Sequence, residues 1–366
     1  MTSSHHDSTS TTPSQPTSPP VVVFMVAFPA PPALAESLTA IHPDAELLWT
    51  PYTESEALRS ARGHHGGRNP DGLETPEITD EMRAHWQRAT IAVAMDLPEG
   101  LDELMPNLQW VQSITAGVDK YDLDAFDRQG VLLTNASGLG SAGIAEFVIA
   151  RLLQEWKNLR TFDAQQREHR WEGMFGTELT GRTLGIAGLG AIGREVARRA
   201  RAFDMTVLAT RASAKPGDTD DAVDELFPAD ALDEMLARCD AVVSTLPSNP
   251  STIGLFDADR FAAMPAGSLF CNVGRGAHVV EADLIAALES GHLRAAALDV
   301  THVEPLPMDD PLWDAPNIYI SPHSSVSLDR YVQNLEALFV ANLGHFFAAE
   351  PLVNAVDTAD TADTNS

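Results

Sequence analysis

Residues 183–213 read TLGIAGLGAIGREVARRARAFDMTVLATRAS, which predicts a strand, a glycine turn, a helix and a second strand. The turn is Gly188-Leu189-Gly190-Ala191-Ile192-Gly193. Its first glycine allows a sharp turn out of the strand, its second lets backbone amides approach a pyrophosphate, and its third lets the helix pack closely on the strand. Unpaired N–H groups at the start of the helix would then face the phosphates. Because strands flank the motif and a helix follows it, we interpret it as a dinucleotide site rather than a plain glycine-rich turn.

The predicted helix after this turn carries one apolar face. Apolar side chains recur along it at helical spacing, and they are Ile192, Val196, Ala200 and Phe203. We therefore expect all four to be buried against the sheet.

The end of the second strand indicates which dinucleotide is bound. A site for NAD would carry Asp or Glu there, to accept a hydrogen bond from the ribose 2′-hydroxyl. This chain has Arg211, followed by Ser213 and Lys215, and a cation with a hydroxyl suits a 2′-phosphate. The alternative is a solvated basic loop, which so acidic a chain disfavours. We expect NADP(H) to be preferred, with NAD(H) possible.

The charge of the chain restricts its partners. Acidic residues outnumber basic ones by 52 to 24, giving a formal net charge of −28, and only three residues are lysine. Such a surface repels nucleic acids and anionic membranes, so we expect neither as a partner. The imbalance and the scarcity of lysine are typical of proteins from salt-loving organisms, with an ordinary acidic protein as the alternative.

Composition also indicates the compartment. Cys239 and Cys271 are too few for a disulfide framework, which fits a reducing environment. No apolar run is long enough to span a bilayer, and residues 21–28 are too short for a signal-peptide core. We expect a cytoplasmic protein.

Alternating strands and helices predict an α/β fold with two units, of which the second contains the glycine turn. The first unit is expected to combine residues 21–140 and 325–355, and the second, dinucleotide-binding unit to be 141–324. The last helix, at about 326–349, is expected to be broken. Residues 1–20 and 356–366 are expected to be disordered.

One internal segment reads as a loop. Residues 59–77 are rich in Gly, His, Arg and Pro, which favours a solvent-exposed loop. His64-His65 within it has no nearby carboxylate or cysteine in the sequence, so we predict no metal site there.

Polar residues follow the later strands of the second domain, where ligands of open α/β sheets bind. Arg275 follows a strand at 269–273, Asp299 ends the next strand, Glu304 lies in the loop after it, and His323 follows the last strand. Singly, these residues could pair with a structural acid, lie on the surface or cap a strand. Together they indicate carbonyl reduction, because an arginine can bind a carboxylate and a histidine beside a glutamate can donate a proton.

The first domain has one candidate anion site. Residues 113–119, at the end of a predicted strand, contain small residues and a glycine that can expose backbone N–H groups. A structural turn explains the segment equally well on its own residues.

From Asn107 to Tyr331 the chain resembles the D-isomer specific 2-hydroxyacid dehydrogenase family. The matching stretches are Ser113–Asp119, Gly181–Gly193, Asn272–Gly276, Asp299-Val300 with Glu304–Pro307, Pro311–Trp313 and Ser321–His323. The resemblance implies that Arg275, Glu304 and His323 are catalytic and that Ala116, Gly117 and Arg275 bind the substrate. It also places a nicotinamide amide near Asp299. Taken together, the motif, the strand end at Arg211 and the resemblance lead us to expect cofactor contacts from Gly188, Gly190, Ala191, Ile192, Gly193, Arg211, Ser213, Leu246, Pro247, Val273, Asp299 and His323, and no metal.

The resemblance implies two Rossmann-like doubly wound domains with a cleft between them, in which the substrate domain is formed from both chain ends. It also implies hydride transfer between a nicotinamide dinucleotide and a 2-oxo acid and D-2-hydroxy acid pair, in a homodimer, and Arg211 makes NADPH the expected dinucleotide. Two features depart from the family pattern: Arg211 replaces an acidic residue, and Ser324-Ser325 replace small apolar residues. A corepressor of the C-terminal binding protein type, which senses the dinucleotide, is the alternative from another class. A formate dehydrogenase would carry glutamine in place of Glu304, so we rank it lower.

Overall fold

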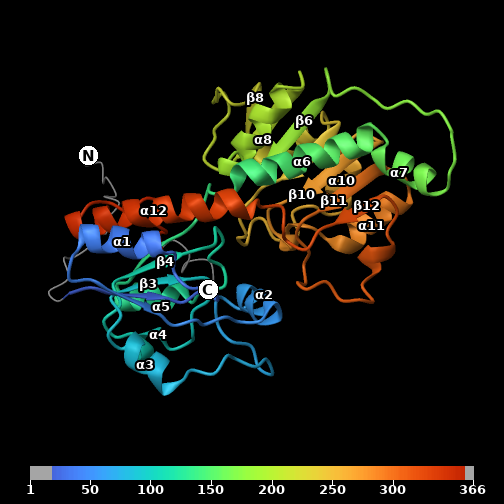
Figure 1. Ribbon diagram of the computed structural model, residues 1–366. Helices are drawn as coiled ribbons and strands as arrows, with labels where there is room; N and C mark the ends of the chain where they lie inside the picture. Colours follow the sequence, from blue (N-terminus) through green and yellow to red (C-terminus); the bar gives the residue numbers. More distant parts are fainter. Residues whose placement is uncertain (1–18, 359–366) are drawn as a thin grey trace, which may run out of the picture. The chain divides into compact units, whose positions relative to one another are not determined.

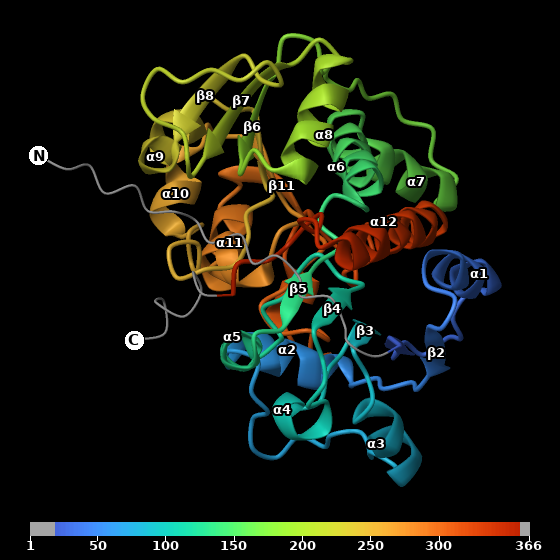
Figure 2. The same ribbon diagram turned by 90° about the vertical axis from the view of Figure 1, so that its left-hand side faces the viewer.

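A computed structural model describes residues 19–358, so most of both expected disordered tails lies outside the described residues. The chain forms two compact units (Figures 1 and 2). Unit 1 holds the described residues up to Leu139 and from Asp329 onward, and unit 2 is Gly140–Leu328. No helix among residues 19–358 is long and apolar enough to cross a membrane.

Unit 1 is built on a five-stranded sheet in which every pair is parallel. Its strands, in spatial order, are β2 (Glu46–Trp49), β1 (Val21–Phe24), β3 (Ile91–Ala94), β4 (Trp110–Ser113) and β5 (Leu132–Thr134). Its helices are α1 (Pro32–Ile41), α2 (Glu56–His64), α3 (Asp80–Trp86), α4 (Leu101–Leu104), α5 (Leu123–Gln129) and α12 (Leu328–Ala348). Parallel strands buried under helices on both faces explain the apolar runs of this unit.

The helices of unit 1 form two separate apolar clusters, one on each face of the sheet. In one of them Trp110 of β4 stacks on Phe339 and Phe346 of α12, with ring centroids 5.5 and 5.4 Å apart. The other holds Trp86 of α3 and Phe126 of α5. This packing keeps α12 continuous over its 21 residues, so the expectation of a broken helix was wrong.

The segment expected to be a loop at 59–77 is helical in its first part. The hydroxyl of Ser55 caps α2 by accepting from the backbone N–H of Leu58. Leu58 and Arg62, four residues apart, are both buried and anchor one face of the helix. His64 is therefore the last residue of α2 and not part of a loop.

Unit 2 is a seven-stranded sheet, also parallel throughout. In spatial order its strands are β12 (Ile318–Ile320), β11 (Leu293–Leu298), β10 (Ser268–Asn272), β9 (Ala241–Ser244), β6 (Thr183–Ala187), β7 (Thr206–Arg211) and β8 (Glu225–Pro228). Its helices are α6 (Ser141–Trp156), α7 (Leu159–Arg167), α8 (Ala191–Arg201), α9 (Leu232–Leu236), α10 (Ala258–Ala263) and α11 (Glu281–Glu289), with short 3-10 turns η1 (Ala229–Ala231), η2 (Gly276–His278) and η3 (Pro311–Asp314).

Two apolar clusters cover the two faces of this sheet, which makes the unit doubly wound. One contains the buried sides of α6 and α8, and the other those of α9, α10 and α11. Figure 2 shows α6 and α8 on one side of the strands and α10 and α11 on the other. The predicted α/β class with Rossmann-like units is confirmed.

The apolar face of α8 is shorter than predicted. Val196 and Ala200 are fully buried and Ile192 packs against the same core, but Phe203 is 39% exposed. The helix ends at Arg201, so Phe203 lies in the turn that leads to β7 and no longer follows the helical spacing.

Candidate active site

The glycine turn after β6 has the geometry that a dinucleotide needs. Gly188 has a φ of 99°, a conformation that favours glycine. A Cβ on Gly193 would lie 2.4 Å from the carbonyl oxygen of Gly188, whereas a Cβ on Gly190 would meet nothing within 4 Å. The turn is thus tightly closed at its base and open at Gly190, where α8 begins. These residues fit a bound pyrophosphate.

The loop after β9 lies against the same turn. The hydroxyl of Thr245 donates to the carbonyl oxygen of Gly188 at 2.6 Å. A Cβ on Gly188 would come within 3.3 Å of the backbone nitrogen of Leu246. Leu246 therefore flanks the glycine turn, and the expected cofactor contacts of Leu246 and Pro247 stay predictions.

Arg275 is held by the strand that precedes it. The side chain of Asn272, the last residue of β10, donates to the carbonyl oxygen of Arg275 at 2.8 Å and accepts from the N–H of Gly274 at 3.1 Å. On the other side a Cβ on Gly276 would lie 2.0 Å from the backbone carbonyl of Thr301. Gly276 therefore brings the Arg275 loop directly onto the loop that carries Glu304.

His278 is a buried residue of this loop that the sequence analysis did not single out. Its Nδ1 lies 3.3 Å from the backbone nitrogen of Arg275 and 3.2 Å from the hydroxyl of Ser244, and its Nε2 lies 3.1 Å from the carbonyl oxygen of Pro247. The carbonyl requires a donor at Nε2, and the Arg275 N–H requires an acceptor at Nδ1, so one neutral tautomer satisfies the site. Burial lowers the pKa of His278 to about 4, which keeps that tautomer neutral.

His323 and Glu304 form a direct pair. Nδ1 of His323 lies 2.9 Å from a carboxylate oxygen of Glu304, whose other oxygen accepts from the backbone N–H of Thr301 at 3.1 Å. The hydrogen bond to Glu304 raises the pKa of His323 above its ordinary value, although partial desolvation of the ring opposes it. With Nδ1 bound to Glu304, Nε2 is the ring atom that can exchange a proton with a ligand.

Asp299 organises the loop that carries His323. Its buried carboxylate accepts from the hydroxyl of Ser321 at 2.6 Å and from the backbone N–H groups of Ser324 and Ser325 at 3.0 and 3.1 Å. The hydroxyl of Ser325 also donates to it. Of the two serines that depart from the family pattern, Ser325 is explained by its hydroxyl, which donates to Asp299, whereas Ser324 donates only through its backbone N–H and its side chain has no structural explanation. The contact of Asp299 with a nicotinamide amide stays a prediction.

The candidate anion loop belongs to unit 1. It is fixed by the hydroxyl of Thr115, which donates to the carbonyl oxygen of Gly117 at 2.9 Å, and by Asn135, which donates to the carbonyl oxygen of Ala116 at 2.9 Å. Within residues 19–358 the backbone N–H groups of Ala116 and Gly117 have no hydrogen-bond acceptor. Donors fixed in this way suit a carboxylate.

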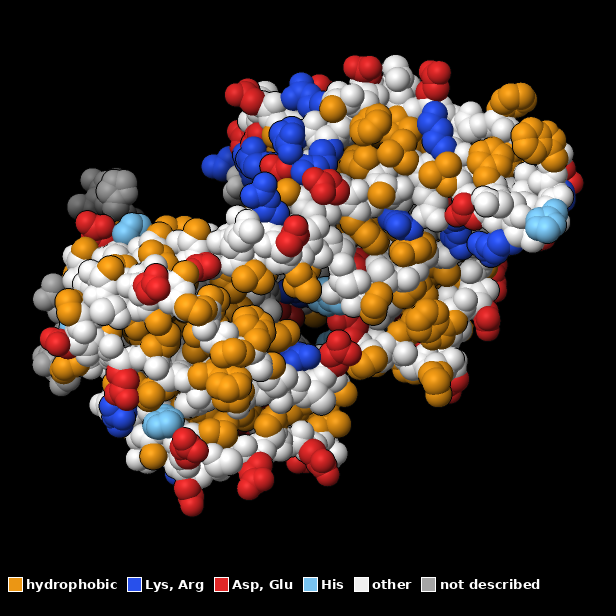
Figure 3. Space-filling view, viewed as in Figure 1, with side chains coloured by type: hydrophobic (Ala, Val, Ile, Leu, Met, Phe, Trp, Pro, Cys, Tyr) orange, Lys and Arg blue, Asp and Glu red, His pale blue; other side chains and the backbone are white. Residues whose placement is uncertain are grey.

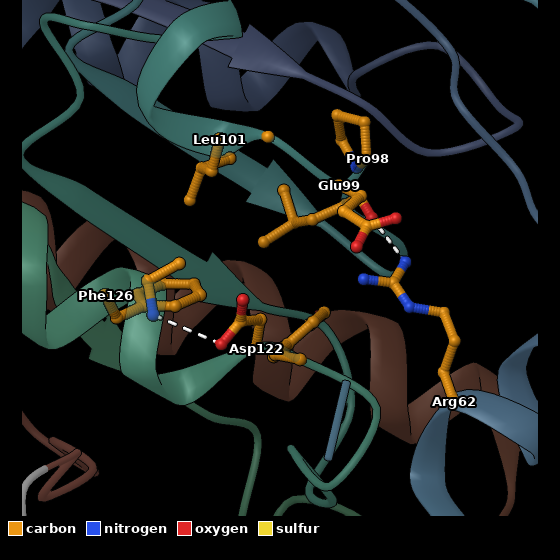
Figure 4. A pocket seen from close by; sticks show the side chains of 10 residues that line it. Arg62, Pro98, Glu99, Leu101, Asp122 and Phe126 are labelled. Carbon is orange, nitrogen blue, oxygen red and sulfur yellow. Dashed lines mark hydrogen bonds between the residues drawn. The ribbon is translucent and has the colours of Figure 1, made fainter. Parts of the chain in front are cut away.

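A hollow elsewhere in unit 1 has an arginine in its wall whose nitrogens are all engaged. It lies between Arg62, the 97–101 segment and the start of α5 (Figure 4). The guanidinium of Arg62 donates to the carbonyl oxygens of Leu97 and Gly67 and to the carboxylate of Glu54. Because each of its nitrogens is engaged, we assign no ligand there. The described residues contain no cluster of three potential metal ligands.

Arg211 ends β7, as predicted, and pairs with an acid. Its Nη1 donates to Asp220 at 2.8 Å, and Ser213 and Lys215 are exposed in the loop that follows. Cys271 is buried, and burial raises the pKa of its thiol to about 12, so it is an unreactive core residue.

Comparison with known proteins identifies the family. A family profile described as the NAD binding domain of D-isomer specific 2-hydroxyacid dehydrogenases matches residues 149–325. A D-3-phosphoglycerate dehydrogenase of Mycobacterium bovis is 38% identical over 224 residues, which cover 61% of this chain and 42% of that protein. The matched region therefore spans less than half of the mycobacterial protein.

Two further relatives match nearly over their full length. Glyoxylate/hydroxypyruvate reductase B of Yersinia pestis is 32% identical over 283 residues, covering 75% of this chain and 85% of that protein. A D-isomer specific 2-hydroxyacid dehydrogenase from Xanthobacter autotrophicus, solved in complex with NADPH and MES, is 30% identical with a TM-score of 0.71, covering 94% of this chain and 100% of that one. With the glycine turn and the Arg275, Glu304 and His323 loops, these matches show that the chain belongs to the D-isomer specific 2-hydroxyacid dehydrogenase family.

Proposed function

We propose that this protein is an NAD(P)-dependent D-2-hydroxyacid dehydrogenase, which transfers hydride between NADPH and a 2-oxo acid and D-2-hydroxy acid pair. The observation that carries the proposal is the His323–Glu304 pair, 2.9 Å apart, in unit 2. Arg275, Glu304 and His323 follow β10, β11 and β12, which are neighbours in one parallel sheet. All three therefore lie at the carboxyl edge of that sheet, as does the glycine turn after β6.

In the proposed reaction the chain supplies proton transfer and substrate binding. Glu304 accepts from Nδ1 of His323 and favours the charged imidazolium, whose Nε2 proton passes to the carbonyl oxygen of the 2-oxo acid. Arg275 binds the substrate carboxylate, because a guanidinium can give it two parallel N–H bonds. When bound, the nicotinamide supplies or accepts the hydride. In the oxidation direction neutral His323 takes the hydroxyl proton.

We propose that residues 21–140 with 325–355, which differ from unit 1 by a few residues at the boundaries, form the substrate domain, and that residues 141–324 form the dinucleotide-binding domain. The backbone N–H groups of Ala116 and Gly117 would give the substrate carboxylate further donors. The supporting observation is that these two amides lack acceptors while their loop is fixed by Thr115 and Asn135.

We propose NADP(H) as the preferred cofactor, with NAD(H) possible. Arg211 stands where a carboxylate would accept from a ribose 2′-hydroxyl, and a guanidinium suits a 2′-phosphate instead. The Xanthobacter relative is a complex with NADPH. Phosphate contacts at the first turn of α8 and the residues Leu246, Pro247 and Val273 complete the proposed site.

We propose a homodimer, supported by an aromatic segment of unit 2. Trp171 and Phe175 are fully exposed. The backbone at Phe175 is nevertheless fixed, because its carbonyl oxygen accepts from Asn158 and the N–H of the nearby Thr177 donates to the carbonyl oxygen of Trp156 at 2.7 Å. Fixed, exposed aromatic rings are typical of interfaces. Light scattering should give a dimer mass for the wild type and a monomer for a Trp171→Ala, Phe175→Ala variant.

We also propose that the protein works in a salt-rich environment, which the acidic surface supports. A cytoplasmic location and a small-molecule substrate are proposed as well. Figure 3 shows acidic side chains spread over both units. Cys239 and Cys271 are both free and buried, as a reducing compartment permits. The corepressor alternative gains no support, because the relatives described above are named as reductases and dehydrogenases.

The test is a panel of glyoxylate, hydroxypyruvate, pyruvate and branched 2-oxo acids, each assayed with NADPH and with NADH. Turnover of at least one acid at ordinary enzyme rates, with kcat above about 1 per second, is the expected result. Tight binding of NADPH without turnover of any acid would support a cofactor-sensing protein instead.

A further inference from the structure

One carboxylate lies between two arginines beside the glycine turn. Asp220 accepts from Nη1 and Nη2 of Arg194 at 2.8 and 2.7 Å, and one of its oxygens also accepts from Nη1 of Arg211 at 2.8 Å. Both guanidiniums therefore donate to the same acid. The sequence positions of the three residues, 194, 211 and 220, give no sign of this contact.

The three side chains come from the elements that frame the glycine turn. Arg194 is the fourth residue of α8, which begins at the turn, and Arg211 is the last residue of β7. Asp220 lies in the connection between β7 and β8, where the backbone N–H of Ala222 donates to it at 3.1 Å. Strand β7 pairs directly with β6, so Arg211 stands at the carboxyl edge next to the turn.

The cluster keeps an excess of positive charge and an unused donor. Two guanidiniums and one carboxylate leave a net charge of +1, and hydrogen bonds from Arg194 hold the pKa of Asp220 well below its ordinary value. Within the described residues, Nε of Arg211 is buried and has no hydrogen-bond partner. Figure 3 shows basic side chains gathered in the region of α8, where Arg194, Arg198, Arg199 and Arg201 lie.

An anion is the ligand that suits this arrangement. A guanidinium binds phosphate as it binds a carboxylate, through planar pairs of N–H donors. Asp220 therefore holds the donors that a phosphate on the adenosine ribose would use. A carboxylate that stays in place would also repel that phosphate, since the two like charges would share the same guanidinium groups.

We propose that Asp220 is an internal substitute for the 2′-phosphate of NADP(H), which competes with that phosphate for Arg194 and Arg211. The inference rests on the proposed dinucleotide site and adds two residues to it. Asp220 moderates the preference for a phosphorylated ribose and keeps the non-phosphorylated cofactor usable. Arg194 becomes a second phosphate ligand beside Arg211.

The test measures binding without catalysis. Calorimetry compares adenosine 2′,5′-bisphosphate with adenosine 5′-monophosphate on the wild type and on Asp220→Asn, which keeps an oxygen for the Ala222 N–H. We expect the variant to bind the bisphosphate roughly tenfold more tightly, because one charge-assisted competitor is lost. Its affinity for the monophosphate should be unchanged. Arg194→Ala should weaken the bisphosphate selectively.

Glu225→Gln is the matched control, since Glu225 also pairs with an arginine, Arg238, at 2.7 Å in unit 2. It should leave both affinities unchanged. Weaker or unchanged bisphosphate binding in Asp220→Asn would overturn the inference, and Asp220→Ala repeats the comparison if the first variant does not fold. Failure of the wild type to bind either nucleotide would instead remove the dinucleotide site itself.

Discussion

The imidazole of His278 joins the backbone of Arg275 to the loop after β9, since its Nδ1 faces the Arg275 N–H at 3.3 Å and its Nε2 faces the Pro247 carbonyl at 3.1 Å. His278 is therefore a positioning residue, which acts through Arg275. His278→Ala should raise KM for the 2-oxo acid and lower kcat/KM by roughly tenfold or more, because a displaced guanidinium binds the carboxylate poorly.

Two variants separate this effect from a loss of stability. His278→Gln retains both an acceptor and a donor and should recover part of the activity. His292→Ala removes another histidine of unit 2 that contacts a carbonyl oxygen, that of Met264, and should leave steady-state constants unchanged. Equal kinetics in His278→Ala and wild type would exclude the positioning role.

Removal of the proposed proton donor or carboxylate ligand should abolish most of the activity. His323→Ala and Arg275→Ala should each lower kcat/KM by about 10²- to 10⁴-fold, in line with the contribution of a positioned acid or charge. NADPH affinity, measured by fluorescence titration, should persist in both variants. Normal turnover in either variant would contradict its assignment.

The His323–Glu304 pair predicts the pH dependence. Because Glu304 raises the pKa of His323 above its ordinary value, the imidazolium needed for reduction is present below that raised pKa and is lost as the pH rises through it. Glu304→Gln removes the charge, so the alkaline limb of kcat/KM for reduction should move to lower pH. Stability from the charged pair should likewise be complete below the ordinary histidine pKa and disappear above the raised one. An unmoved pH profile with full activity would remove Glu304 from the mechanism.

The proposed preference for NADPH over NADH depends on the positive charge of Arg211. A charge-assisted hydrogen bond contributes about 1.5–3 kcal/mol, so its loss should shift preference by roughly ten- to a hundredfold. Arg211→Asp should change a preference for NADPH into one for NADH, mainly through KM, because the 2′-phosphate is remote from hydride transfer. The measurement is kcat/KM for both cofactors at one fixed salt concentration. A wild type that favours NADH would contradict the prediction.

The surplus of acidic residues predicts stabilisation by salt. With 52 acidic against 24 basic residues, self-repulsion should destabilise the fold in dilute buffer and be screened by added ions. The thermal midpoint should rise from dilute to multimolar KCl. NaCl and an uncharged osmolyte serve as controls. A thermal midpoint that does not change with KCl would contradict the salt-adaptation proposal and favour an ordinary acidic protein.

Residues whose position follows from backbone requirements could be predicted from the sequence. The glycine turn is one case, because the φ of Gly188 favours glycine and a Cβ on Gly193 would overlap a backbone carbonyl oxygen. Arg275, Glu304 and His323 are another, since parallel strands bring their ends to one edge without any knowledge of side-chain contacts.

Contacts made across loops could not be predicted. Asp220 is one of 52 acidic residues, and only the folded connection between β7 and β8 places it on Arg194 and Arg211. His278 reads as an ordinary loop residue until Pro247 and Ser244 are brought beside it. The continuity of α12 likewise depends on Trp110, which is more than 200 positions away in the chain.

The contact of Gly276 with Thr301 sets a limit on how this protein can be redesigned. Even a methyl group there would overlap the carbonyl of Thr301, so any replacement must push the Arg275 loop away from the Glu304 loop. A variant library that randomises the residues around Arg275 to alter substrate choice should therefore keep this glycine fixed. An alanine at position 276 would leave Arg275, Glu304 and His323 in the sequence but would move the Arg275 loop away from the loop that carries Glu304.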